Sequence, residues 1–118
     1  MENAEKDLRE RTKKFAHRII RRYSALPKST VAQVLGKQLL RSGTSIGANC
    51  READRARSKA EFISKIGDCL READETLYWI ELIRDEALLP VTRLEPILKE
   101  ANELVAILVT ILKRSRSS

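Results

Sequence analysis

The sequence predicts an all-α protein that folds as an up-down-up-down four-helix bundle. The chain is rich in leucine, alanine, glutamate, lysine and arginine, and its 118 residues include only three prolines and four glycines, a composition typical of helices. Apolar residues recur at intervals of three and four through four long segments separated by short breaks. We therefore expect antiparallel neighbours in a single domain, residues 1–118, which is long enough to bury a core without disulfides or metals.

The first helix is expected to end at Pro27, because the residue before a proline avoids the helical conformation. Its apolar stripe consists of Leu8, Thr12, Phe15, Ile19, Tyr23 and Leu26. His17 stands alone on the flank, without a cysteine or carboxylate partner at ligand spacing. We interpret it as a surface residue rather than a metal ligand.

The second helix should begin at Ser29 or Thr30, with Gln33 available for a capping box, and run to about residue 56. Its core candidates are Val31, Val34, Leu35, Leu39 and Ile46.

Small and polar residues interrupt the second helix where a simple bundle helix would carry leucines. Gly43 and Gly47 lie four residues apart on one side, so another backbone can approach that side closely. Ser45 and Asn49 belong to a polar strip on the same helix. We expect these four residues to set helix or subunit packing, either through ordinary contacts within the chain or through direct contact with a ligand.

The third helix starts with a capping box formed by Ser58 and Glu61. Tyr78 and Trp79 are consecutive, so they point about 100° apart and cannot both face one core. We expect one of them to pack against another subunit. After a turn at residues 88–90, Thr92 and Glu95 should cap a fourth helix with a wide apolar face, and residues 113–118 should form a basic tail that frays.

Charge is unevenly distributed along the chain. Residues 1–57 carry fourteen Lys and Arg against six acids, whereas residues 58–90 carry four against eight. A basic face of this kind favours phosphate binding, although a solvated surface with incidental charge explains it as well. The candidate nucleic-acid-binding residues are Lys13, Lys14, Arg18, Arg21, Arg22, Lys37, Arg41, Arg51, Arg55 and Arg57.

Signatures of catalysis are missing from the sequence. One histidine cannot supply two Glu-x-x-His motifs, and there is no P-loop, G-x-S-x-G or H-E-x-x-H motif. A Cys50/His17 pair is conceivable across the first two helices, but nothing local supports it. The acids Asp68, Glu72, Glu75 and Glu81 could bind a divalent ion, yet they fit partners for the arginines better. We expect no enzymatic activity, cofactor or metal.

The N-terminus is charged and lacks an apolar signal region, and no run of about 18 uncharged apolar residues occurs. We therefore expect a cytoplasmic protein with no membrane partner, in which Cys50 and Cys69 are reduced and structural.

Several motifs together resemble the four-helix-bundle family named after the 23S rRNA intervening-sequence proteins. The typical pairs Arg-Ser, Ser-Ile, Ala-Asn and Glu-Ala fall at residues 41–42, 45–46, 48–49 and 52–53. The Ser-Lys-x-Glu-Phe helix start falls at residues 58–62, and Glu-Thr-x-Tyr-Trp at residues 75–79. The likeness covers nearly the whole chain, and Cys50 departs from it where an aliphatic residue is usual.

This resemblance implies a bacterial, homopentameric ring of four-helix bundles with a basic surface, sometimes encoded within an rRNA insertion. The chain also looks like a relative of the accessory variability determinant of diversity-generating retroelements, which binds nucleic acid and a reverse transcriptase. Our hypothesis is a non-catalytic, oligomeric protein that binds RNA or DNA. The alternative is a scaffold that binds only proteins, with the helix-2 glycines and the wide helix-4 face serving assembly.

Overall fold

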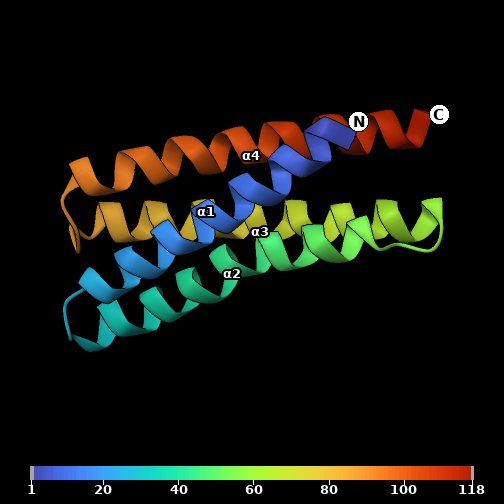
Figure 1. The fold of residues 1–118 in the computed structure, drawn as a ribbon. Coiled ribbons are helices and arrows are strands. Elements are labelled where there is room, and N and C mark those ends of the chain that lie inside the picture. Colours follow the sequence, from blue (N-terminus) through green and yellow to red (C-terminus); the bar gives the residue numbers. More distant parts are fainter. Residues whose placement is uncertain (1, 118) are drawn as a thin grey trace.

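The protein is a bundle of four antiparallel helices in up-down-up-down order, as predicted (Figure 1). The computed structural model describes the backbone of residues 2–117 and the side chains of residues 7–117. Each helix lies against the next in the chain, whereas α1 and α4 share a smaller interface. The bundle measures 47 × 21 × 20 Å, and its helices are α1 (Glu2–Ala25), α2 (Thr30–Asp54), α3 (Lys59–Asp85) and α4 (Val91–Ser117).

Serine side chains cap the starts of α2 and α3. Ser29 Oγ accepts from the Ala32 N–H at 3.3 Å, and Ser58 Oγ accepts from the Glu61 N–H at 3.1 Å, which is the first half of the predicted capping box. Each bond satisfies a backbone donor that has no partner within the helix. The Glu61 carboxylate accepts from the Arg57 N–H at 3.4 Å and not from that of Ser58, so the second half of the box is not formed.

The predicted cap of α4 is wrong. This helix begins at Val91, before Thr92, and the Pro90 carbonyl accepts from the Arg93 N–H at 2.9 Å. At its other end α4 stays helical through Ser117, and residue 118 lies outside the described residues. Fraying of the tail from residue 113 stays a prediction. The end of α2 also differs slightly from the expectation, because the helix stops at Asp54.

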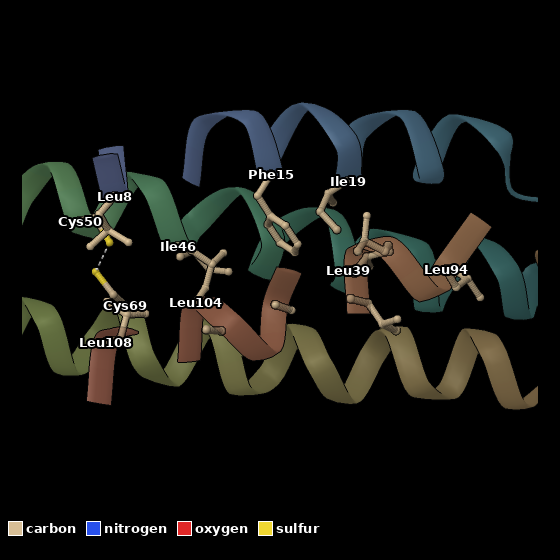
Figure 2. Packing of buried hydrophobic residues seen from close by; sticks show 14 of the residues in the cluster. Leu8, Phe15, Ile19, Leu39, Ile46, Cys50, Cys69, Leu94, Leu104 and Leu108 are labelled. Atoms are coloured by element: carbon tan, nitrogen blue, oxygen red, sulfur yellow. Dashed lines mark hydrogen bonds between the residues drawn. The ribbon is translucent and has the colours of Figure 1, made fainter. Parts of the chain in front are cut away.

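The core runs along the bundle axis and takes residues from all four helices (Figure 2). The predicted stripe of α1 is confirmed, because all its members are buried except the half-buried Tyr23. On α2 the prediction is partly wrong, since Val31 and Val34 are 54% and 56% exposed. The residues that face inward there are Ala32, Gly36 and Leu39, spaced by fours and threes, and this phase turns the two valines outward.

Glycines of α2 set its close approach to α1. A Cβ atom added to Gly43 would lie 2.8 Å from Cγ1 of Ile19, and one added to Gly47 would lie 3.2 Å from Oγ1 of Thr12. On the other side of α2 the contact with α3 includes a buried hydrogen bond, in which the Thr76 hydroxyl donates to Ser42 Oγ at 3.0 Å. The helix therefore uses small side chains toward both neighbours.

Within the part of the chain that the structure describes, no helix combines the length and apolar character needed to cross a membrane.

Candidate nucleic-acid interface

A groove of about 390 Å³ lies between α1 and α2, and we refer to it as the cationic groove. Thr12 and Gly47, which meet at the α1/α2 contact, belong to its lining. The charged residues that line it are Arg9, Lys13, Arg51, Arg55 and Glu52. Lys13 and Arg9 are four residues apart on α1 and share one face of that helix. Arg51 lies in the last turn of α2, and Arg55 is the residue that directly follows the helix.

The cations of this groove are incompletely neutralised. Arg9 pairs with Asp54 at 3.3 Å, and the carboxylate of Glu52 binds Lys65 of α3 at 2.7 Å. Lys13, Arg51 and Arg55 are exposed and form no ion pair with any described residue. Three unpaired cations at one groove create a positive potential that attracts an anionic ligand.

A second group of cations, the arginine cluster, lies where α1 meets the start of α4. The Arg22 Nε–H donates to the Arg93 carbonyl at 2.9 Å. The pKa of Arg22 is lowered, first by partial burial and then by the positive charges of Arg18, Arg93 and Arg21. Arg18, Arg21 and Arg93 are therefore close enough to repel Arg22 and complete the cluster, and a bound phosphate would relieve that repulsion.

The exposed Lys14 lies on α1 two turns before Arg21 of the arginine cluster, so these two residues share one face of the helix. Lys37 is exposed on α2, two turns before Thr44 of the groove lining. These residues extend the basic surface along both helices.

Two of the sequence-predicted candidates lie elsewhere. Arg41 binds Glu72 of α3 at 3.2 Å and also contacts Glu75. Its hydrogen bond with Glu75 raises the pKa of Arg41, and the same bond lowers the pKa of Glu75. Arg57 lies in the connection between α2 and α3, beside a shallow hollow that mixes acids and bases. The structure therefore does not bring Arg41 and Arg57 into the cationic groove.

The residues expected to set packing face different ways. Gly43 and Gly47 face α1, whereas Asn49 borders a small hollow between α2 and α3 with Asp68 and Arg71. The half-buried Ser45 donates its hydroxyl to the Arg41 carbonyl at 2.6 Å. Contact of these residues with a second subunit stays a prediction.

Tyr78 and Trp79 point in different directions, as consecutive residues of a helix must. Trp79 is half-buried and its indole N–H donates to Glu75 Oε1 at 3.1 Å, whereas Tyr78 is 55% exposed. Their rings meet edge to face with centroids 5.1 Å apart. Tyr78 is therefore the member of the pair that is exposed for a subunit contact, and that contact stays a prediction.

Among the described residues, no group of three or more histidine, cysteine or acidic side chains is arranged to hold a metal ion. Cys50 is buried and hydrogen-bonds to Cys69, while His17 is exposed on α1. These two residues are therefore not placed as nucleophile and base.

Sequence reasoning missed Arg9 and Arg93. The position of Arg9, one turn before Lys13, could have indicated its place in the groove. Arg93 carried no such signal, because it meets α1 only after the helices pack.

The fold and this surface define a class of protein, a helical bundle with a cationic flank formed by its first two helices. Comparison with known proteins narrows the class. The family model described as 23S rRNA-intervening sequence protein matches residues 5–110, so the chain belongs to that family.

A solved structure agrees with this assignment. It is that of a protein with unknown function from the S23 ribosomal protein family of Bacteroides thetaiotaomicron VPI-5482, which is 39% identical in sequence. The TM-score is 0.87, and the match covers 93% of this chain and 98% of that one. No curated protein matches the chain.

Proposed function

We propose that this protein is a non-catalytic nucleic-acid-binding bundle that holds the phosphate backbone of RNA or DNA on its α1/α2 flank. The observation that carries the proposal is the cationic groove, where Lys13, Arg51 and Arg55 have no carboxylate partner among the described residues. Lysine and arginine at such a surface neutralise phosphates and release the counterions that surround the nucleic acid.

Recognition through shape and backbone fits the surface better than base stacking. Of the five aromatic residues, only Tyr78 is exposed, and it lies on α3 away from the groove lining. Stacking on single-stranded bases needs exposed rings beside the basic surface. A structured RNA or a duplex, contacted at its phosphates, is therefore the ligand class that we propose.

We further propose that the protein acts as a homopentameric ring. Copies of the cationic flank in one assembly would convert weak phosphate contacts into useful affinity.

The most concrete biological role that we propose is that of an accessory factor in a diversity-generating retroelement. In that role the protein binds template RNA and a reverse transcriptase. The second possible role is that of a protein encoded within an rRNA intervening sequence. A neighbouring reverse-transcriptase gene with a variable repeat would favour the retroelement role. A position of the gene inside an rRNA operon would favour the intervening-sequence role.

The test is binding of the purified full chain to structured RNA and duplex DNA across a salt series, with the mass in solution measured on the same sample. We expect log affinity to fall linearly with log salt. Replacing Lys13, Arg51 and Arg55 together by alanine should weaken binding roughly tenfold at low salt and reduce the salt slope by about two to three.

A matched control loses the same charge on the other side of the bundle. Arg71→Ala, Arg84→Ala and Lys99→Ala remove three cations from α3 and α4, two of which only pair with nearby acids. This triple variant should bind within about twofold of the parent protein, because none of the three cations lines the cationic groove or belongs to the arginine cluster. Equal loss of affinity in both triple variants would show that net charge, and not the groove, governs binding.

The second candidate function is a scaffold that binds only proteins. It is favoured by five exposed apolar side chains among the described residues, Ile20, Val31, Val34, Tyr78 and Val91. All five belong to the halves of their helices next to the α1–α2 and α3–α4 turns, and these turns lie at the same end of the bundle (Figure 1). Exposed apolar residues gathered at one end are typical of a contact surface. A folded oligomer that binds no nucleic acid at low salt would support the scaffold and overturn the nucleic-acid proposal.

A further inference from the structure

Two thiols from neighbouring helices meet inside the core. Cys50 of α2 and Cys69 of α3 are 3% and 0% exposed, and their sulfur atoms lie 2.9 Å apart. Figure 2 shows the two sulfur atoms directed at each other between the helices. The phosphate-binding surface proposed above uses neither residue.

Contacts on both sides of the pair fix the alignment of α2 with α3. Toward the α2–α3 connection, Glu52 binds Lys65 at 2.7 Å. Toward the middle of the bundle, the Thr76 hydroxyl donates to Ser42 at 3.0 Å. The thiols therefore meet because the helices are held in this alignment, and the sulfur–sulfur distance exceeds that of a disulfide bond by only about 0.9 Å.

We propose that Cys50 and Cys69 form an oxidation site, at which a peroxide converts the two thiols into an intramolecular disulfide that joins α2 to α3. In the first step the Cys50 sulfur attacks a peroxide oxygen, the O–O bond breaks, and a sulfenic acid and one water form. In the second step the Cys69 sulfur attacks the Cys50 sulfur and displaces the second water. The thiols lose two electrons and two protons in total, and a dithiol reductant reverses the change.

The surroundings of the pair make a small oxidant necessary. The hydrogen bond with Cys50, and then burial, raise the pKa of Cys69 well above its ordinary value. Because the thiolate is the reactive form, the raised pKa slows the reaction of Cys69 with every oxidant, peroxide included, so the oxidation should be slow. Burial acts separately, by keeping bulky reagents out of the core. Hydrogen peroxide is small enough to reach the pair during brief openings of the bundle, whereas a bulky alkylating reagent should react only after unfolding.

A disulfide at this position would restrict the unfolded chain. The bond closes a loop of 20 residues, from Cys50 through Cys69. By loop-closure entropy, this should raise the Tm by roughly 10 °C for a chain of this size, provided that the native helices are not displaced.

The experiment treats the reduced, folded full chain with hydrogen peroxide and compares it with an untreated sample. Trypsin digestion without reductant should give a linked pair of peptides, residues 42–51 joined to residues 66–71, which separates after reduction. The Tm of the treated protein should rise, and dithiothreitol should return it to the starting value.

The matched variant Cys69→Ala leaves Cys50 without a partner, so it should give neither the linked peptides nor the rise in Tm. Three results would overturn the proposal. The first is that both thiols of the treated parent protein still react with a thiol reagent after unfolding. The second is that the disulfide bond joins two separate chains. The third is that the Tm of the oxidised protein is lower than that of the reduced protein. The peptide measurement on the parent protein stands even where the variant folds poorly.

Discussion

Arginines on the two sides of α2 differ in whether they form ion pairs. Toward α1, Arg51 and Arg55 border a groove and have no carboxylate partner among the described residues. Toward α3, Arg41 binds two carboxylates, Glu72 and Glu75. The difference lies in the neighbouring helix, because α3 carries acids along its contact with α2 and α1 carries bases. An arginine therefore binds a partner helix on one side of α2 and offers its charge to solvent on the other.

The two sides differ in packing as well as in charge. Gly43 and Gly47 bring the α1 and α2 backbones close together. At the α2/α3 interface, hydroxyls and thiols fill the space, as the Ser42–Thr76 and Cys50–Cys69 contacts show. The first interface leaves little room for an added methyl group at Gly43, and the second contains polar atoms that match across it.

The largest effect should come from adding a methyl group at the α1/α2 interface. We predict that Gly43→Ala lowers the free energy of unfolding by about 1–3 kcal/mol, because the new Cβ atom would lie 2.8 Å from the fully buried Ile19. Urea unfolding of the parent and variant proteins measures the change.

Gly67 of α3 is the control, because a Cβ atom there would meet nothing within 4 Å. Gly67→Ala should raise the free energy of unfolding by about 0.5–1 kcal/mol through helix propensity. If Gly43→Ala were stabilising to the same extent, the α1/α2 interface would not be limited by space.

A smaller effect should follow from releasing Arg41. The double variant Glu72→Gln, Glu75→Gln removes both carboxylates that bind this arginine. We predict that affinity for duplex RNA at low salt rises about three- to tenfold, because the α2/α3 side then carries an unpaired cation and two fewer negative charges. Binding titrations at two salt concentrations measure it.

The matched double variant Asp74→Asn, Glu81→Gln removes two exposed acids of α3 that form no ion pair with a described residue. Any increase in affinity that it shows reports net charge alone. Equal increases in the two double variants would contradict a specific role for the release of Arg41.

The smallest effect concerns pH. The hydrogen bond with Arg41, followed by that with Trp79, holds the pKa of Glu75 below its ordinary value of 4.5. A carboxyl group with a lowered folded-state pKa contributes stability that is complete above the unfolded-state pKa and is lost as pH falls through the folded-state pKa. The parent protein should therefore be more stable than Glu75→Gln at pH 7, and this difference should shrink below pH 4.5.

This difference should stay below about 1 kcal/mol, because the pair is partly exposed and screened by solvent. Urea unfolding at pH 7, 5, 4 and 3 measures it. A difference that grew on acidification would contradict the assigned sign of the pKa shift.

Helix periodicity was sufficient to predict the fold. The stripe of α1 and the Ser58 cap depend on residues close together in sequence, and both were predicted correctly. The exposed positions of Val31 and Val34 were not predicted, because hydrophobicity alone assigns a valine to the core. In the structure, the requirement for small residues against α1 decides how α2 is rotated.

The candidate site was less predictable than the fold. Lysine and arginine positions could be read from the sequence, but whether each one meets an acid depends on helices that are distant in the chain. Arg41 lies 31 residues before Glu72, and Arg22 meets Arg93 across 71 positions. Local patterns do not report such pairs, so the division of cations between paired and unpaired sites emerged only from the packed bundle.

The order in which the helices touch bears on how the chain folds. Each helix packs mainly on its neighbour in sequence, and the interface that joins the first and last helices is the smallest. Contacts between sequence neighbours form quickly, because little loop entropy is lost in bringing the partners together. Helical hairpins should therefore assemble early, and the contact between α1 and α4, which includes the Arg11 hydrogen bonds to Glu100, should close last.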